Sequence, residues 1–164
     1  MTAEITSLIE SLRSDSASQR QEAASELLSF GPDAAPAAVA LVEAADSDSE
    51  TCDLVTAALE DLGPPAAEML TPLAAILQRP SLDSPYWAAT LLGRLEADAA
   101  PAIGELITAA AEHPQLPVRQ RAVWALGKIG PPAIAALETL EKISAEDDPR
   151  LSSLAGDSMA KIRA

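Results

Sequence analysis

The sequence contains few residues that could support catalysis, and their spacing matches no catalytic motif. The one histidine, His113, stands in the segment AEHPQLP, and no spacing around it implies an orienting acid and a nucleophile. A hydrolytic triad needs all three groups in mutual contact. We therefore expect His113 to be an exposed loop residue and the protein to have no catalytic residues.

Residues that could bind a metal or a cofactor are equally sparse. The acids Asp46, Asp48 and Glu50 resemble the start of a calcium loop, but Thr51 and Ala57 replace its glycine and its bidentate acid. The three acids therefore predict a solvated turn before a helix, where negative charge is favourable. We expect no metal site and no cofactor.

The single cysteine, Cys52, leaves no partner for an intramolecular disulfide. With only one histidine in the chain, it also cannot complete an ordinary structural zinc site. Acidic neighbours oppose activation of its thiol by the positive end of a helix. Cys52 is therefore interpreted as a small packing residue.

The strongest binding candidates are aromatic and basic residues at corresponding positions of successive predicted helices. Both tryptophans and four of the eleven basic residues fall on one ridge in the last three repeats. Large aromatic surfaces beside arginine are typical of protein-binding hot spots. Alternatively, each tryptophan leans into the seam between repeats and stabilises the fold. The predicted partner-binding patch consists of Trp87, Arg94, Arg121, Trp124 and Lys128.

The helices that must position this patch follow from an internal repeat. Similar segments recur around Gly31, Gly63, Glu96 and Gly130, at spacings of 32, 33 and 34 residues. Such a period is typical of a solenoid, in which neighbouring units bury a shared core. Apolar residues at three-to-four spacing before and after each junction predict two amphipathic helices per unit. The expected pairs span about residues 2–30, 33–62, 65–95, 98–129 and 131–163, within a single domain over 1–164, with a bend near Pro72 at residues 68–72.

Composition supports a helical protein with an aliphatic core. Alanine and leucine supply 35 and 22 of the 164 residues, and both favour helix. The net charge of −14 argues against binding nucleic acid or an anionic membrane. We find neither a leader peptide nor a run of about 20 apolar residues, and therefore expect a cytoplasmic protein.

Charge is distributed unevenly along the chain. Residues 21–78 contain eleven acids and no base, whereas residues 79–164 carry nine bases and eleven acids. The N-terminal half is therefore either a surface for a basic partner or an adaptation for solubility.

The segment Val118–Pro131, VRQRAVWALGKIGP, closely resembles the second helix and exit turn of HEAT-like repeats of the short type also found in phycobilisome lyase proteins. The resemblance implies an all-α, right-handed α-solenoid, or α-α superhelix, of about five HEAT-like helix pairs whose second helices line the concave face. It also implies an Asp–Arg ladder between repeats. Arg20 and Arg119 match its arginine, while Cys52, Pro85 and Ser152 interrupt it.

HEAT arrays mostly serve as binding scaffolds, so the function expected from the resemblance is a non-catalytic scaffold or adaptor for protein–protein interaction. Its partner would be a protein segment on the concave face, acidic and aromatic near the patch and basic near the N-terminal end. The protein itself would be a monomer or associate weakly. An alternative is an accessory subunit of a chromophore lyase of the phycobilisome type. A HEAT-fold DNA glycosylase would need a basic groove, which the charge of −14 disfavours.

Overall fold

The computed structural model describes residues 2–164, and all regular structure within them is helical. Ten α-helices and four short 3-10 helices follow one another in this part of the chain. The chain divides into two compact units, which we call unit 1, ending at Met69, and unit 2, Leu70–Ala164. That residues 1–164 form one domain stays a prediction.

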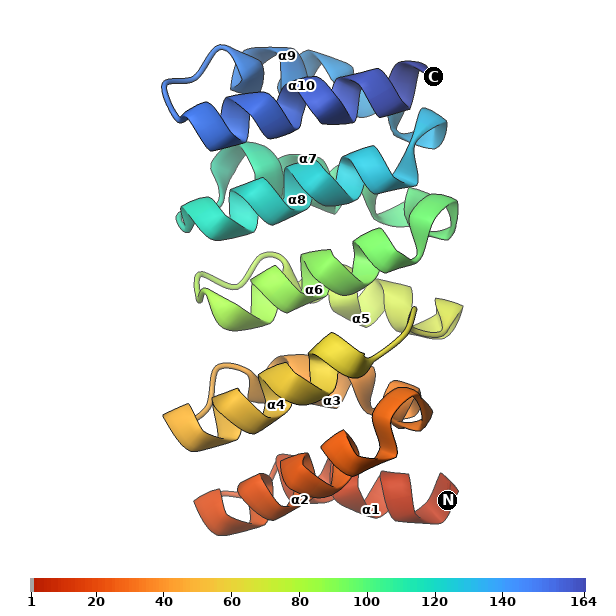
Figure 1. Cartoon of the computed structure of the whole chain (residues 1–164), viewed down its shortest axis with the longest axis vertical. Coiled ribbons are helices and arrows are strands. Elements are labelled where there is room, and N and C mark those ends of the chain that lie inside the picture. Colours follow the sequence, from red (N-terminus) through yellow and green to blue (C-terminus); the bar gives the residue numbers. More distant parts are fainter. Residues whose placement is uncertain (1) are drawn as a thin grey trace. The chain divides into compact units, whose positions relative to one another are not determined.

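Unit 1 contains two antiparallel helix pairs (Figure 1). Helix α2 packs against α4, and α1 packs against both α2 and α3. The elements are α1 (Thr2–Leu12), α2 (Ala17–Phe30), η1 (Gly31–Ala37), α3 (Ala38–Ala44), α4 (Ser49–Asp61) and η2 (Ala67–Met69).

Unit 2 contains three helix pairs in which the longer second helices form one row (Figure 1). Helix α8 packs between α6 and α10, and α7 and α9 lie behind α8 and α10 respectively. The elements are α5 (Leu70–Ile76), α6 (Asp83–Arg94), η3 (Glu96–Ala102), α7 (Ile103–Glu112), α8 (Leu116–Ile129), η4 (Pro131–Ala136), α9 (Leu137–Ser144) and α10 (Pro149–Arg163).

In every repeat except the first, the first helix begins as 3-10 helix and becomes α-helical three to seven residues later, a feature that the sequence analysis did not predict. Pro36 and Pro101 lie inside two of these 3-10 segments, and neither can donate a backbone hydrogen bond there. The bend expected near Pro72 at residues 68–72 stays a prediction. The change from 3-10 to α-helix falls between Met69 and Leu70, so Pro72 lies in the first turn of α5.

The predicted apolar stripes form the cores of the two units. Leu27, Leu41 and Leu59 are fully buried in unit 1, as are Leu106 and Leu126 in unit 2. Burial of each such side chain stabilises the fold by about 1.5–3 kcal/mol. The three-to-four spacing therefore predicted the buried face of most helices correctly.

The run Ala17–Ala44 includes an 18-residue window with a mean hydropathy of 1.2, long and apolar enough to cross a membrane. In the structure it is three elements, because α2 ends at Phe30 and the chain turns at the next residue, Gly31, where φ is 53°. Several of its apolar side chains, among them Leu27 and Leu41, lie in the core of unit 1. Packing within unit 1 thus accounts for the hydropathy of this run.

Candidate functional site

Small residues set the close approach of α6, α8 and α10 in unit 2. A Cβ at Gly93 on α6 would overlap the indole ring of Trp124 on α8, and one at Gly127 would overlap Ser158 on α10. The Ser158 hydroxyl also donates a hydrogen bond of 2.8 Å to the carbonyl of Val123. Trp124 and Ser158 therefore occupy corresponding positions, each facing a glycine one repeat earlier.

Arg121 lies between two aromatic rings. Its guanidinium carbon is 4.5 Å from the ring centre of Tyr86 and 5.0 Å from that of Trp124. One guanidinium nitrogen donates a hydrogen bond to the Tyr86 hydroxyl. Tyr86 in turn packs edge-on against Trp87, with ring centres 5.8 Å apart. The rings thus hold the arginine head group at a defined place on the surface.

A cleft of about 290 Å³ opens beside this stack, between side chains of α6, α8 and α10. We call it the Arg121 cleft. Its lining residues are Tyr86, Pro117, Gln120, Arg121, Trp124, Arg150 and Leu154. Two arginines and no acid line it, so its formal charge is positive although the chain carries −14.

The predicted patch is only partly brought together. Arg121 contacts Trp124 and, through Tyr86, approaches Trp87. Trp87 is only 8% exposed, which for this residue agrees with the alternative that it leans into the seam between repeats. Trp124 is half-buried, because its ring packs against the neighbouring repeat at Gly93.

The other two basic residues of the patch lie nearer the ends of α6 and α8 and do not line the Arg121 cleft. Arg94 is half-buried in the last turn of α6. Lys128 forms an ion pair of 2.9 Å with Glu96. That these two side chains bind a partner stays a prediction.

Five lining residues are not members of the predicted patch: Tyr86, Pro117, Gln120, Arg150 and Leu154. A signal for three of them exists, because Tyr86, Gln120 and Leu154 are spaced 34 residues apart. Tyr86 and Gln120 each come one residue before a member of the predicted patch, namely Trp87 and Arg121. Arg150 carries no such signal and is placed by the start of α10.

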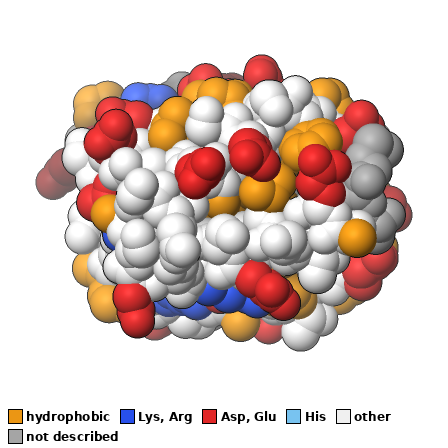
Figure 2. Space-filling view, turned by 90° about the horizontal axis from the view of Figure 1, so that it is seen from below, with side chains coloured by type: hydrophobic (Ala, Val, Ile, Leu, Met, Phe, Trp, Pro, Cys, Tyr) orange, Lys and Arg blue, Asp and Glu red, His pale blue; other side chains and the backbone are white. Residues whose placement is uncertain are grey.

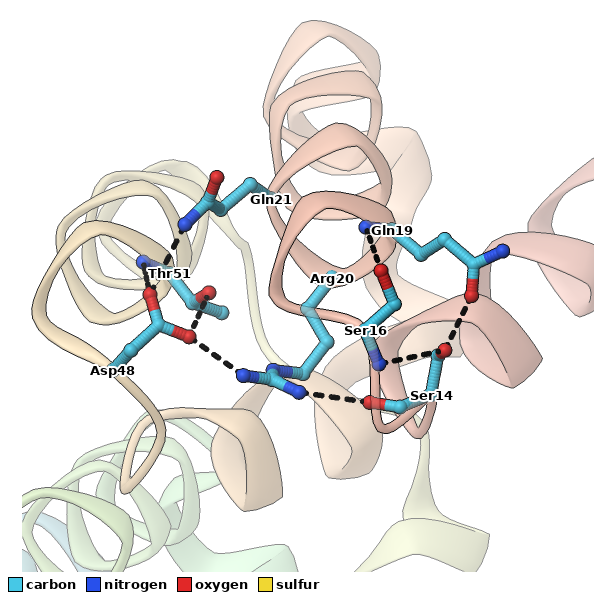
Figure 3. A network of polar contacts seen from close by, with 7 residues as sticks. All are labelled: Ser14, Ser16, Gln19, Arg20, Gln21, Asp48 and Thr51. Carbon is cyan, nitrogen blue, oxygen red and sulfur yellow. Dashed lines mark hydrogen bonds and ion pairs between the residues drawn. The ribbon is translucent and has the colours of Figure 1, made fainter.

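In unit 1, an ion pair of 2.8 Å joins Arg20 of α2 to Asp48, the residue that caps α4 (Figure 3). Asp48 also accepts hydrogen bonds from Gln21 and from the backbone and hydroxyl of Thr51. The Arg20 guanidinium, and next the Thr51 backbone N–H, hold the pKa of Asp48 well below its usual range. Asp48 is thus a structural acid that links two repeats.

Unit 2 has a similar link between its last two repeats. Arg119 of α8 binds both carboxylate oxygens of Glu146, at 3.0 and 2.7 Å. Gln120 donates to Asp148, the residue that caps α10, at 3.2 Å. Arg20 and Arg119 are the two arginines that matched the ladder pattern, and both bind an acid of the next repeat.

His113 is buried, contrary to the expected exposed loop residue, and is 8% exposed. Its Nδ1 accepts from the backbone N–H of Gln115, which leaves Nε2 to donate to the carbonyl of Arg79 at 2.8 Å. The ring therefore ties the loop before α6 to the loop before α8. Among residues 2–164, no three histidine, cysteine or acidic side chains are arranged to hold a metal.

The acidic character of unit 1 is visible on its surface. Figure 2 looks onto the side of unit 1 where α1 and α2 lie, and acidic side chains are scattered over it. Both bases of this unit are engaged by acids, Arg13 by Glu43 and Arg20 by Asp48. Because both arginines are paired with acids, they do not form a positive surface like that of the Arg121 cleft.

Known structures share this architecture. An engineered protein solved by the Northeast Structural Genomics Consortium has a TM-score of 0.63 and 21% identity, covering 97% of this chain and 79% of that chain. A second one has a TM-score of 0.65 and 22% identity, covering 96% and 80%. A designed armadillo repeat protein in complex with the peptide (KR)4 has a TM-score of 0.66 and 18% identity, covering 98% and 82%. No curated protein matches the chain.

A family model described as HEAT repeats matches residues 70–160, which is more than half of the chain and lies within unit 2. The matched residues include α6, α8 and most of α10, which line the Arg121 cleft. The helix pairs and the similar structures agree with an α-solenoid fold. The chain therefore belongs to the HEAT repeat family.

Proposed function

We propose that this chain is a non-catalytic protein-interaction module that binds a segment of a partner protein on the second helices of unit 2. The observation that carries the proposal is the Arg121 guanidinium, held between Tyr86 and Trp124 at the edge of an open cleft. An arginine ordered by aromatic rings loses little side-chain freedom on binding, which favours affinity.

The fold supports the same conclusion at a coarser level. HEAT and armadillo folds are typically non-catalytic, and a designed armadillo neighbour is complexed with a peptide. By that analogy an extended segment would lie across α6, α8 and α10. No observation favours the chromophore-lyase alternative.

The test is a selection of random peptides displayed on phage against the immobilised full chain, after which each selected peptide is tested for binding to an Arg121→Ala variant. We expect peptides that bind the wild-type chain and a Lys161→Ala control but not Arg121→Ala. Lys161 is an exposed base of α10 outside the cleft. If all selected peptides bind the Arg121→Ala variant equally well, the cleft is not the binding site. If no peptide is selected at all, the proposed function is wrong.

A further inference from the structure

The charge of the Arg121 cleft separates it from the rest of the molecule. The chain has 25 acids and 11 bases, yet none of the seven lining residues is acidic and two are arginine. Several basic side chains of this chain form ion pairs with acids, as Arg20 does with Asp48 and Arg119 with Glu146. Within residues 2–164, Arg121 and Arg150 form no ion pair.

The backbone adds positive potential at the same place. Pro117 and Arg150 lie in the first turns of α8 and α10, helices of 14 and 15 residues, and both line the cleft. The N-terminal end of a helix carries a partial positive charge. Of the acids in the turn before α10, Asp148 caps that helix and binds Gln120, and Glu146 binds Arg119. These two carboxylates are therefore engaged by Gln120 and Arg119, and neither acid lines the cleft.

The cleft also offers apolar surface next to its charges. Trp124 and Leu154 are half-buried and line it together with Pro117. A guanidinium matches the geometry of a carboxylate, and Arg121 has further N–H groups besides the one bound to Tyr86. The lining thus combines carboxylate recognition with a place for an aromatic or aliphatic side chain.

We infer that the Arg121 cleft binds a carboxylate of an acidic partner segment, with an adjacent apolar side chain on Trp124 and Leu154, and that it rejects basic segments. This inference rests on the proposed function and adds that the partner segment is negatively charged where it meets the cleft. The (KR)4 peptide complexed with the designed armadillo protein has the opposite charge. It is therefore an informative negative probe.

The test measures binding of defined peptides to the full chain by isothermal titration calorimetry. The first probe is acetyl-Glu-Glu-Phe-Glu-Glu-Phe-amide, and the second replaces each Glu by Gln. A third probe is the Gln peptide with a free C-terminal carboxylate in place of the amide. It shows whether the cleft binds a terminal carboxylate or a side-chain carboxylate. We expect the Glu peptide to bind at least about tenfold more tightly than the Gln amide, more weakly at high salt, and any binding of (KR)4 not to be weakened by Arg121→Gln.

The matched variants are Arg150→Gln, Arg121→Gln and Lys161→Gln, each of which removes one positive charge. The two cleft variants should weaken binding of the Glu peptide about tenfold, and Lys161→Gln by no more than about twofold. Arg150 is exposed, so its variant keeps the test independent of folding. Equal affinity for the Glu peptide and the Gln amide, binding of (KR)4 that Arg121→Gln weakens, or an equal loss in Lys161→Gln would overturn the inference. Phage-selected peptides that need Arg121 but lack acids would overturn it while leaving the proposed function intact.

Discussion

The indole ring of Trp124 packs against Gly93 of the preceding repeat, and Ser158 packs against Gly127 in the same way one repeat later. The absence of a side chain at Gly93 makes room for the ring. The same ring contacts Arg121, so the spacing of α6 and α8 and the shape of the Arg121 cleft depend on one contact.

Replacing Gly93 by alanine should destabilise unit 2 by about 1–3 kcal/mol, because the new methyl group overlaps Trp124. The control is Gly104→Ala in α7, where an added Cβ meets no atom within 4 Å. That change should stabilise the chain by about 0.5–1 kcal/mol through helix propensity. Urea unfolding followed by circular dichroism measures both. Equal stability of the two variants would show that Trp124 is not constrained by Gly93.

The two tryptophans should differ in what their removal does. Trp87 is buried, so Trp87→Ala should cost about 3–5 kcal/mol of folding stability. Trp124 is half-buried, and Trp124→Ala should cost less stability while weakening peptide binding by about 2 kcal/mol. Thermal melts and calorimetry of the single variants, with Trp87→Phe as a control that keeps a ring, separate the two effects. A Trp124→Ala variant as unstable as Trp87→Ala would assign both residues to the core.

Glu96 occupies the junction position that holds Gly31 and Gly130 in other repeats, and its φ is 51°. A non-glycine residue in this region costs about 1–2 kcal/mol. Its ion pair with Lys128 is partly exposed and contributes about 0–1 kcal/mol. Glu96→Gly should therefore raise stability by up to about 1 kcal/mol, and Glu96→Gln, which keeps the strained backbone, should not. Chemical denaturation of the three proteins decides this. A less stable Glu96→Gly variant would mean that the ion pair outweighs the strain.

The helix pairs could be predicted because the spacing of apolar residues indicates which face of each helix is buried. The repeat length indicates where one pair ends and the next begins. Leu41, Leu59 and Leu126 were assigned to buried stripes and are fully buried. The 3-10 segments could not be predicted in the same way, because Pro36 and Pro101 are compatible with either helix type in a first turn.

The site was predicted less completely than the fold. Aligned positions identify residues that share a ridge, and Arg121 and Trp124 do line the cleft. The alignment does not give the side-chain rotamer, which decides that Trp87 is buried while its neighbour Tyr86 reaches Arg121. His113 was misassigned because its two hydrogen bonds are to backbone groups of Arg79 and Gln115, which leave no side-chain pattern in the sequence.

The link between Arg20 and Asp48 should make the stability of the chain depend on pH in a defined direction. The pKa of Asp48 is lowered in the folded state from a value of 3.8, first by Arg20 and then by Thr51. The ionised form is therefore favoured by folding. Its stabilising effect is complete above the unfolded pKa and is lost as the pH falls through the folded pKa.

Asp48→Asn keeps a side chain that can cap α4 but removes the negative charge. The variant should be less stable than wild type at neutral pH, and the difference should shrink as the pH falls below about 4. Asp53→Asn, an exposed acid of the same helix, serves as the matched control and should show a small difference. Urea unfolding midpoints of the three proteins between about pH 7 and about pH 2.5 measure this. A difference between wild type and Asp48→Asn that stays constant over that range would show that the Arg20 link does not stabilise the folded chain through the charge of Asp48.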